Sequence, residues 1–298
     1  MPSVSSLEEA SAALAGAHAE SRRIRIGADL TTEGLDRILE HDPGDLTCTA
    51  EAGVRLSQLQ AVLAASGQRL SLDPPGDPTI GALLARNVSG PLRHRFGAPR
   101  DLVLGATLVL GDGTIASAGG KVVKNVAGYD LARLVCGSEG RLALIARASF
   151  RLHPLPKASR TLVVETDDAP AVVATLLRSQ LQPSALEVLH PGRVLVLFEG
   201  SERAVDAQAA AVRELGGVES DDTLWDESRA RQAAAPGRLR FTPGDLAEAL
   251  AELGDAVVRP AAGIAYTAEP MDETAPIPGR ALVDRIAAEL DPRGVLAA

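Results

Sequence analysis

The sequence predicts an α+β fold, and three patterns support this prediction. Residues 102–110 form a mostly apolar run of strand length, and Asp112-Gly113 behind it is a hairpin turn signal. From Leu142 to His153 apolar and polar residues alternate, as in a strand with one solvated face. After residue 157 strands and helices alternate at a spacing typical of a plait with its helices on one face.

Composition excludes several classes of protein. The 298 residues suffice for about two domains, and a hydrophobic content of 46% is ample for their cores. A net charge of −9 argues against nucleic acid as a partner, because no basic face can neutralise phosphates. The two cysteines are far apart and the five histidines are isolated, so we expect no disulfide framework, iron–sulfur ligand set or metal site.

The N-terminal region indicates a cytoplasmic protein. Glu8 and Glu9 lie where a signal peptide needs basic charge, and no apolar run approaches membrane-spanning length. We therefore expect a cytoplasmic location and no transmembrane segment, with any contact with the inner membrane made through partner proteins.

In the first half, Thr79 is the clearest helix signal. It follows the Pro/Gly-rich loop 73–78 and has the chemistry of an N-cap for a helix through Arg86. The start of this helix is a plausible anion site, and a plain capped helix is the alternative. The other expected elements are strands at 22–26 and 46–50, a helix at 56–63 and an irregular segment at 87–97.

The stretch 119–145 is the strongest candidate for a ligand-binding loop. Two of the three lysines of the chain, Lys121 and Lys124, lie here among glycines, together with Tyr129. Loop glycines next to helix and strand ends present backbone N–H groups to phosphate or carbonyl oxygens. A solvated surface turn is the alternative. Residues 111–116 fit the dinucleotide pattern GxGxxG/A, but the residues after Gly113 resemble a strand rather than a helix, which argues against a nicotinamide site.

The second half begins after a break at residues 154–156, where we place a domain boundary. Expected strands are 161–165, 186–189, 193–198, 238–241 and 256–259, and expected helices follow Asp168, Ser201 and Thr242 or surround Trp225. A Pro-rich connector at 269–278 leads to a final helix at 281–290.

From Thr79 to Ile145 the chain resembles the FAD-binding domain of the vanillyl-alcohol oxidase/p-cresol methylhydroxylase (PCMH) superfamily. The similarity lies in residues 87–113, NVSGPLRHRFGAPRDLVLGATLVLGDG, and residues 128–145, GYDLARLVCGSEGRLALI. Lys124 to Asp130 is most similar to the FAD-binding subunits of glycolate oxidase, and 289–295 resembles the family's ending. The resemblance implies a PCMH-type FAD-binding domain at 1–156, to which residues 277–298 return. A smaller plait-like cap domain on the substrate side would span 157–276.

By position, the resemblance also implies the residues that bind FAD. They are Thr79, Ile80 and Gly81 at the diphosphate; Asn87, Ser89, Gly90, Lys124, Asn125, Gly128, Tyr129 and Asp130 on the flavin side; Gly137, Ser138 and Gly140 through their backbone; and Ile145 against the cofactor. Lys124 is the expected partner of the flavin ring, while Lys121 meets a phosphate or water.

The sequence departs from the family at several positions. Residues 25–29 stand where a longer glycine-rich diphosphate loop is usual, and Ala82, Arg141 and Ala143 replace smaller or different residues. The resemblance implies an FAD-dependent oxidoreductase, an auxiliary subunit with non-covalent FAD in a glycolate oxidase complex. Its partners would be a catalytic flavoprotein and an iron–sulfur subunit, and the complex would act on a small 2-hydroxy acid. The catalytic residues are unknown. The alternative is a flavin-free structural subunit that keeps the fold.

Overall fold

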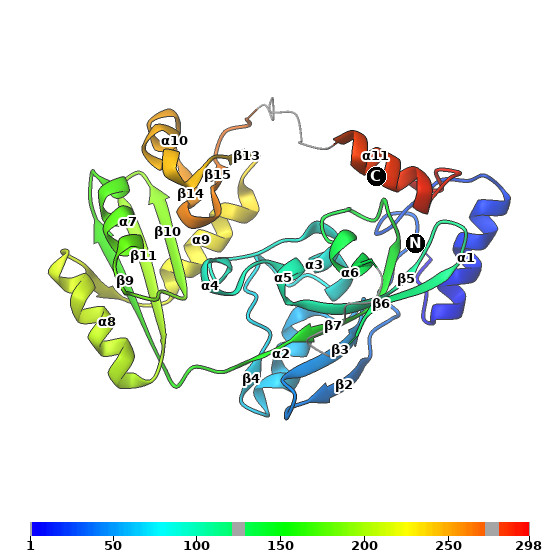
Figure 1. The fold of residues 1–298 in the computed structure, drawn as a ribbon, viewed down its shortest axis with the longest axis horizontal. Helices are drawn as coiled ribbons and strands as arrows, with labels where there is room; N and C mark the ends of the chain where they lie inside the picture. The colour runs from blue at the N-terminus through cyan, green and yellow to red at the C-terminus, as the bar shows by residue number, and fades with distance from the viewer. Residues whose placement is uncertain (1, 121–128, 272–279, 298) are drawn as a thin grey trace.

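Two antiparallel sheets, each with its own helices, lie side by side in the computed structural model (Figure 1). The structure describes residues 2–120, 129–271 and 280–297. The first sheet is formed by residues before 152 and the second by residues 158–267. This is the α+β fold that the sequence predicts.

The first sheet has five strands in the order β2-β3-β7-β5-β6, and each neighbouring pair is antiparallel. The strands are β2 (Ile38–Asp42), β3 (Thr47–Glu51), β5 (Val103–Val109), β6 (Ile115–Gly119) and β7 (Leu144–Arg151). In β7 the side chains of Ala148 and Phe150 are buried while Arg151 is exposed. The predicted alternation is therefore confirmed from Ala146 to Arg151. It is wrong at the start of the strand, where residues 144–146 are all buried because the register against β5 shifts and both faces of the strand are covered.

Helices cover the buried face of this sheet. They are α2 (Leu56–Ala64), α3 (Ile80–Arg86), α5 (Pro99–Leu102) and α6 (Leu131–Leu134). The short helix α4 (Arg93–Phe96) has no buried residue and lies against the second sheet. Leu59 and Leu63 of α2 and Leu83 of α3 pack in one core with Cys48 and Phe150 of the strands. The segment 87–97 was expected to be irregular, yet it contains the short helix α4. This turn is stabilised from outside, because the Asp73 carboxylate accepts the N–H of Leu92 at its start.

Residues 111–116 form a hairpin between β5 and β6, in which Val109 is paired with Ile115. Gly113 has a φ of +87° at the turn, a conformation that favours glycine. The prediction of a hairpin in place of a nicotinamide motif is confirmed here.

The two ends of the chain meet beside the first sheet. The N-terminal elements are α1 (Leu7–Ala19) and β1 (Ile24–Arg25). Elsewhere in the first half, β4 (Gln68–Arg69) pairs with β8 (His153–Pro154) in a separate two-stranded sheet. At the C-terminus, α11 (Arg280–Leu290) packs Ile286, Ala287 and Leu290 against the core of the first sheet. β16 (Leu296–Ala297) then pairs in parallel with β1.

The second sheet has seven strands in the order β12-β9-β11-β10-β14-β15-β13. They are β9 (Ala158–Glu165), β10 (Ala185–His190), β11 (Arg193–Gly200), β12 (Val218–Ser220), β13 (Gly237–Arg240), β14 (Ala256–Arg259) and β15 (Ile264–Thr267). The helices are α7 (Ala169–Arg178), α8 (Glu202–Glu214), α9 (Thr223–Ala234) and α10 (Leu246–Glu252), with 3-10 turns η1 (Pro243–Asp245) and η2 (Pro260–Ala262).

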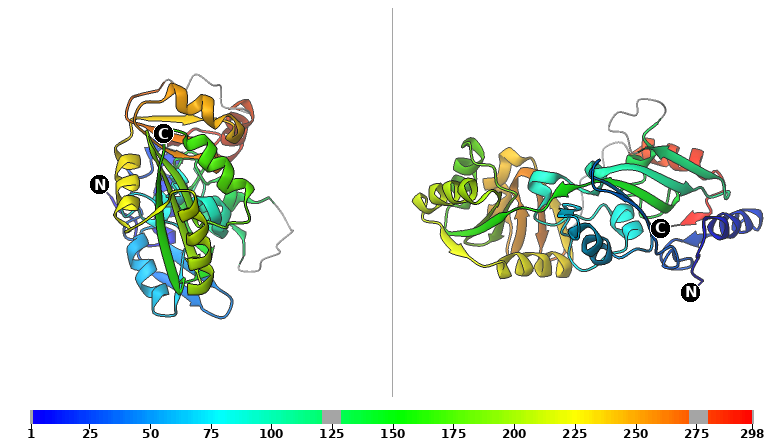
Figure 2. Two further views of the ribbon diagram at one scale, coloured as in Figure 1. Left: turned by 90° about the vertical axis from the view of Figure 1, so that its left-hand side faces the viewer. Right: turned by 90° about the horizontal axis from the view of Figure 1, so that it is seen from below.

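Helices cover both faces of the second sheet, which corrects the expectation of a single covered face. α7, α8 and α10 pack on the face that carries Val194 and Val196. α9 lies on the opposite face, where Trp225 packs on Leu189 and Leu195. Figure 1 shows the chain segment from β7 to β9 that connects the two sheets and shows α9 between them, and Figure 2 shows the same arrangement from two other sides. The sequence pattern did not predict that α9 covers the second face of the sheet. α9 packs on the second sheet with one side and faces the first half of the chain with the other.

Candidate functional site

A cavity of about 640 Å³ opens beside the start of α3. Four segments form it: residues 26–33 after β1, Arg55 before α2, residues 78–86 along α3, and residues 139–145, which lead into β7. Four of the predicted FAD-binding residues line it, namely Thr79, Gly81, Gly140 and Ile145. The remaining lining residues are Ile26, Gly27, Thr31, Thr32, Glu33, Arg55, Pro78, Ala82, Ala85, Arg86, Glu139 and Ala143.

The turn after β1 is held rigid by local bonds. The Gly27 N–H donates to the Leu30 carbonyl at 2.8 Å, and the Arg25 guanidinium makes two 3.0 Å hydrogen bonds to Asp29. The hydrogen bond from Arg25 lowers the pKa of Asp29 to about 2. Gly27 has a φ of +89°, and a Cβ at this position would meet no atom within 4 Å. The turn thus presents bare backbone to open space at the cavity.

The start of α3 contacts the cavity by its side chains and Cα atoms, since its first N–H groups are bonded within the protein. The Ile80 N–H donates to the Val54 carbonyl at 2.9 Å and the Gly81 N–H to the Ala52 carbonyl at 2.7 Å. The Thr79 hydroxyl caps the helix by accepting the Ala82 N–H at 3.3 Å. The N-cap prediction for Thr79 is therefore confirmed. These bonds agree with the alternative interpretation of this helix, in which it is a plain capped helix with no free N–H groups for an anion.

The segment 137–140 is joined to the end of α3. The N–H groups of Gly137 and Glu139 donate to the carbonyls of Leu84 and Ala85, at 3.0 and 2.8 Å. Gly140 has a φ of +81°, and a Cβ there would lie 3.1 Å from the Ile26 Cβ. The segment therefore lies directly against the turn after β1. Ser138 is 8% exposed, and its hydroxyl has no hydrogen-bond partner among the described residues.

The other predicted residues lie around this cavity or beyond it. Ile80 is buried in the core beneath α3, and Asp130 caps α6 by accepting the Arg133 N–H. The Tyr129 side chain is 90% exposed. Asn87, Ser89 and Gly90 follow α3 and lead toward the second sheet. Lys121, Lys124, Asn125 and Gly128 lie outside the described residues. The assignment of all these positions to FAD stays a prediction.

The cavity includes charged residues that the sequence did not single out. The guanidinium of Arg55 lies 3.8 Å from the Glu33 carboxylate and donates to the Asp77 carbonyl at 3.0 Å. Arg86, on the last turn of α3, has no ion-pair partner among the described residues. Single arginines on a helix carry no motif, so only the fold brings them to this cavity.

A second cavity, of about 370 Å³, lies where the two sheets meet. Pro75 and Val88 come from the first half of the chain, and Gln232, Arg238 and Tyr266 are among the residues from the second. The Arg238 guanidinium lies 5.8 Å from the centre of the Tyr266 ring, a cation–π distance. Across the described part of the chain, no group of three or more His, Cys, Asp and Glu side chains could hold a metal ion. No helix in the described ranges is long and apolar enough to span a membrane.

The larger cavity has the properties of a site for part of a dinucleotide. Its volume lies in the range of small-molecule sites. Gly27 leaves room for close approach of a ligand, and Arg55 and Arg86 supply positive charge. The Ser138 hydroxyl, buried without a hydrogen-bond partner among the described residues, does not line the cavity but adjoins the lining residue Glu139. Apolar contact comes from Ile26 and Ile145. These groups fit the nucleotide portion of FAD.

Comparison with known proteins defines the class. Residues 6–119 match the family model described as FAD binding domain. The structure superposes on alkyldihydroxyacetonephosphate synthase with a TM-score of 0.72 and 16% sequence identity, over 99% of this chain and 74% of that chain. The fold is thus similar to that of alkyldihydroxyacetonephosphate synthase, and the family match identifies FAD as the cofactor of the domain.

The curated relatives point to a narrower group. Glycolate oxidase subunit GlcE of Escherichia coli is 35% identical over 227 residues, which cover 72% of this chain and 64% of that protein. Glycolate oxidase subunit GlcD of Bacillus subtilis is 34% identical over 62% of this chain and 41% of that protein. The aligned part thus spans less than two thirds of these relatives. The predicted resemblance is confirmed: the chain is related to glycolate oxidase subunits and carries a match to the FAD binding domain.

Proposed function

We propose that this chain is an auxiliary, FAD-carrying subunit of a glycolate-oxidase-like complex, with FAD bound non-covalently. The observation that carries the proposal is the cavity beside α3. It gathers Thr79 and Gly81 from the start of α3 and Gly140 and Ile145 from the chain that enters β7, at positions that the resemblance assigns to FAD. When bound, FAD supplies the two-electron redox chemistry that amino-acid side chains lack.

The chain's own residues bind and orient the cofactor. Gly27 and Gly140 allow the nucleotide to approach the backbone closely, and the Thr79 and Ser138 hydroxyls offer hydrogen bonds. Arg86 provides a cation for the diphosphate in place of a longer glycine loop. The segment from Asn87 to Gly90 and residues 124–130 complete the flavin side in this proposal.

The proposed partners are a catalytic flavoprotein and an iron–sulfur subunit, acting in the cytoplasm on a small 2-hydroxy acid. Support comes from the names of the relatives: both GlcE and GlcD are subunits of glycolate oxidase. Within the complex, this chain would provide a bound flavin and a docking surface, while its partners bind the 2-hydroxy acid and carry electrons onward.

The visible absorption spectrum of the purified protein tests the proposal. A flavin band retained after gel filtration is the expected result. If FAD is lost during purification, added FAD at about 100 Kd should stabilise the protein by roughly 2.7 kcal/mol. A colourless protein that FAD does not stabilise would favour a flavin-free structural subunit. Two residues favour the flavin-free alternative. Ala82 and Ala143 narrow the cavity at positions where the family has smaller residues.

A matched pair of variants locates the site. Ala82→Leu places a larger side chain in the cavity on a helix that tolerates leucine, and should weaken FAD binding at least tenfold. Ala12→Leu makes the same change at an exposed position of α1 and should leave binding unchanged. Equal FAD affinity in both variants, measured by quenching of FAD fluorescence, would contradict the assignment of FAD to this cavity.

A further inference from the structure

Arg259 connects the second sheet to the first half of the chain. Its side chain is 2% exposed and lies at the end of β14. One guanidinium nitrogen, Nη1, donates to the main-chain carbonyl of Ser89 at 2.8 Å. Nε donates to the Glu187 carboxylate at 2.6 Å, and Nη2 donates to the Gln232 amide oxygen at 2.6 Å. A single buried cation therefore joins β10, α9 and the segment that follows α3.

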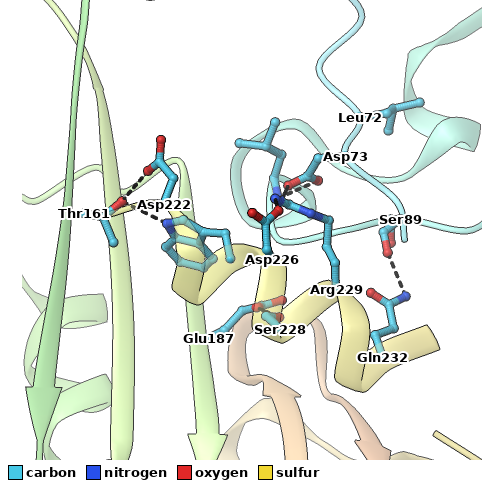
Figure 3. A network of polar contacts seen from close by, with 12 residues as sticks. Leu72, Asp73, Ser89, Thr161, Glu187, Asp222, Asp226, Ser228, Arg229 and Gln232 are labelled. Atoms are coloured by element: carbon cyan, nitrogen blue, oxygen red, sulfur yellow. Dashed lines mark hydrogen bonds and ion pairs between the residues drawn. The ribbon is translucent and has the colours of Figure 1, made fainter. Parts of the chain in front are cut away.

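The partners of Arg259 are themselves fixed. Glu187 is fully buried, and its other carboxylate oxygen accepts a hydrogen bond from the Ser228 hydroxyl. The amide nitrogen of Gln232 donates to the same Ser89 carbonyl at 3.0 Å, as Figure 3 shows. Two donors from the second half of the chain thus converge on one carbonyl oxygen. Nη1 of Arg259 also donates to the Tyr266 hydroxyl at 3.3 Å, and a guanidinium fixed by four directed bonds determines where the Ser89 carbonyl lies.

The segment around Ser89 has little freedom to move on its other side. Asn87 ends α3 in the left-handed conformation, with a φ of 50° and a ψ of 41°. A Cβ on Gly90 would lie 1.8 Å from the Asp73 carbonyl oxygen, so the backbone is packed against residue 73 without a gap. At its start, the segment continues from the last turn of α3, whose carbonyls accept the N–H groups of Gly137 and of Glu139, and Glu139 lines the cavity. A shift of the Ser89 backbone would therefore move the end of α3 and, with it, Gly137 and Glu139.

We propose that Arg259 is a positioning residue of the flavin site: by holding the Ser89 carbonyl, it makes FAD binding depend on the docking of the second sheet against the first half. The proposal rests on the proposed function, in which FAD lies against residues 87–90. Coupling between two sites is reciprocal, so FAD in turn strengthens the docking. An ordinary interface contact would stabilise the fold without this link.

The variant Arg259→Lys tests the coupling. Lysine keeps a positive charge beside Glu187, but one ammonium, with three N–H donors, cannot reproduce the four directed bonds of this guanidinium. We expect FAD to bind at least tenfold more weakly at a temperature where both proteins are fully folded. Arg193→Lys is the matched control, because Arg193 makes a two-bond ion pair with Glu227 inside the second half and does not contact residues 87–90. It should leave FAD affinity unchanged.

Hydrogen exchange gives a readout that a purely structural role would not change. In the unmodified protein, FAD should slow amide exchange in α9 and β14, which lie outside the larger cavity. In Arg259→Lys this protection should be lost, even when FAD is added to saturation. If Arg259→Lys does not fold, Gln232→Leu removes the second donor to Ser89 at similar volume. It should reduce both FAD affinity and the FAD-induced protection.

The outcomes separate this inference from the proposed function. If the unmodified protein binds FAD and the folded variant binds it equally well, with the same protection of α9, the positioning role of Arg259 is wrong and the proposed function stands. If the unmodified protein does not bind FAD at all, both are overturned.

Discussion

Gly81 packs so closely against Ala52 that no residue with a Cβ fits at position 81 without a shift of the neighbouring atoms. A Cβ on Gly81 would be 2.9 Å from the Ala52 Cβ and 3.2 Å from its carbonyl oxygen, while the Gly81 N–H already donates to that oxygen. The requirement for glycine here comes from packing of α3 on the strand that ends at Glu51. Contact with a ligand is a separate matter, and the two roles can be separated by measuring stability without FAD.

Gly81→Ala should lower the free energy of unfolding by about 1 kcal/mol. Overpacking costs roughly 1–3 kcal/mol, and the better helix propensity of alanine offsets up to about 1 kcal/mol. Gly16→Ala in α1 is the control, because a Cβ there meets no atom within 4 Å, and it should stabilise by roughly 0.5–1 kcal/mol. Urea unfolding of the FAD-free proteins measures both, and equal effects would contradict the packing argument.

Asp73 makes stability depend on pH. Burial raises its pKa to about 7, against the opposing effects of Arg259, the Leu92 N–H and Arg229. In the unfolded chain the carboxyl titrates near its ordinary pKa of about 4. Between about pH 4 and 7 the folded protein therefore holds a proton that the unfolded chain has lost. The contribution of Asp73 is favourable below this window and is lost as the pH rises through it.

Asp73→Asn should remove this dependence while keeping an acceptor for the Leu92 N–H. The stability of the variant relative to the unmodified protein should rise with pH between 4 and 7, by at most about 1.4 kcal/mol per pH unit. His153, whose pKa burial lowers to about 4, gives the opposite slope, but it is present in both proteins and cancels in the difference. Urea unfolding at pH 5, 6 and 7 checks the prediction, and a constant difference would refute it.

Among the elements, α7 and α8 begin with the same sequence signal and differ in structure. Asp168 accepts the Ala171 N–H at 3.1 Å and so caps α7. Ser201 occupies the equivalent position of α8 without a side-chain cap bond. The residue type predicted both helix starts correctly, but the cap bond depends on the rotamer that each environment permits.

Asp168→Ala should therefore destabilise the protein by about 1 kcal/mol, within the range of roughly 0.5–2 kcal/mol for lost caps. Ser201→Ala should change stability by no more than a few tenths of that amount, since no cap bond is lost. Thermal and urea unfolding of the two variants compare the caps directly. A larger loss in Ser201→Ala than in Asp168→Ala would show that the described cap bonds do not determine the stability of these helices.

At the scale of the whole molecule, ion pairs and the chain ends hold the two halves together. Arg69 makes two hydrogen bonds to Glu199, at 2.7 and 2.6 Å, across the connection between β8 and β9. The final strand β16 pairs with β1, and the Asp291 carboxylate accepts the Leu296 N–H at 2.6 Å. The proposed domain boundaries at 154–156 and 269–278 thus separate two halves of the chain that contact each other through side chains such as Arg69 and Glu199.

Limited digestion with proteinase K, which cleaves with broad specificity, should cut first near Lys157 and within 269–278. The C-terminal fragment should remain bound to residues 1–156 on gel filtration, because its strand is part of the N-terminal unit. Arg69→Gln should speed the cut near Lys157 by breaking the ion pair with Glu199. Release of the C-terminal fragment after cleavage would contradict the proposed domain division.

The sequence by itself determined the local structure of this protein and the identity of its fold. The caps at Thr79 and Asp168, the hairpin at residues 111–116 and the alternation of β7 follow from short-range chemistry that each segment carries alone. Only the tertiary structure decided which face α9 covers, that Arg86 reaches the larger cavity, and that Arg259 binds a carbonyl 170 residues away in the chain. These contacts join distant segments, and no local pattern encodes them, because their energy depends on burial that exists only once the two halves have docked.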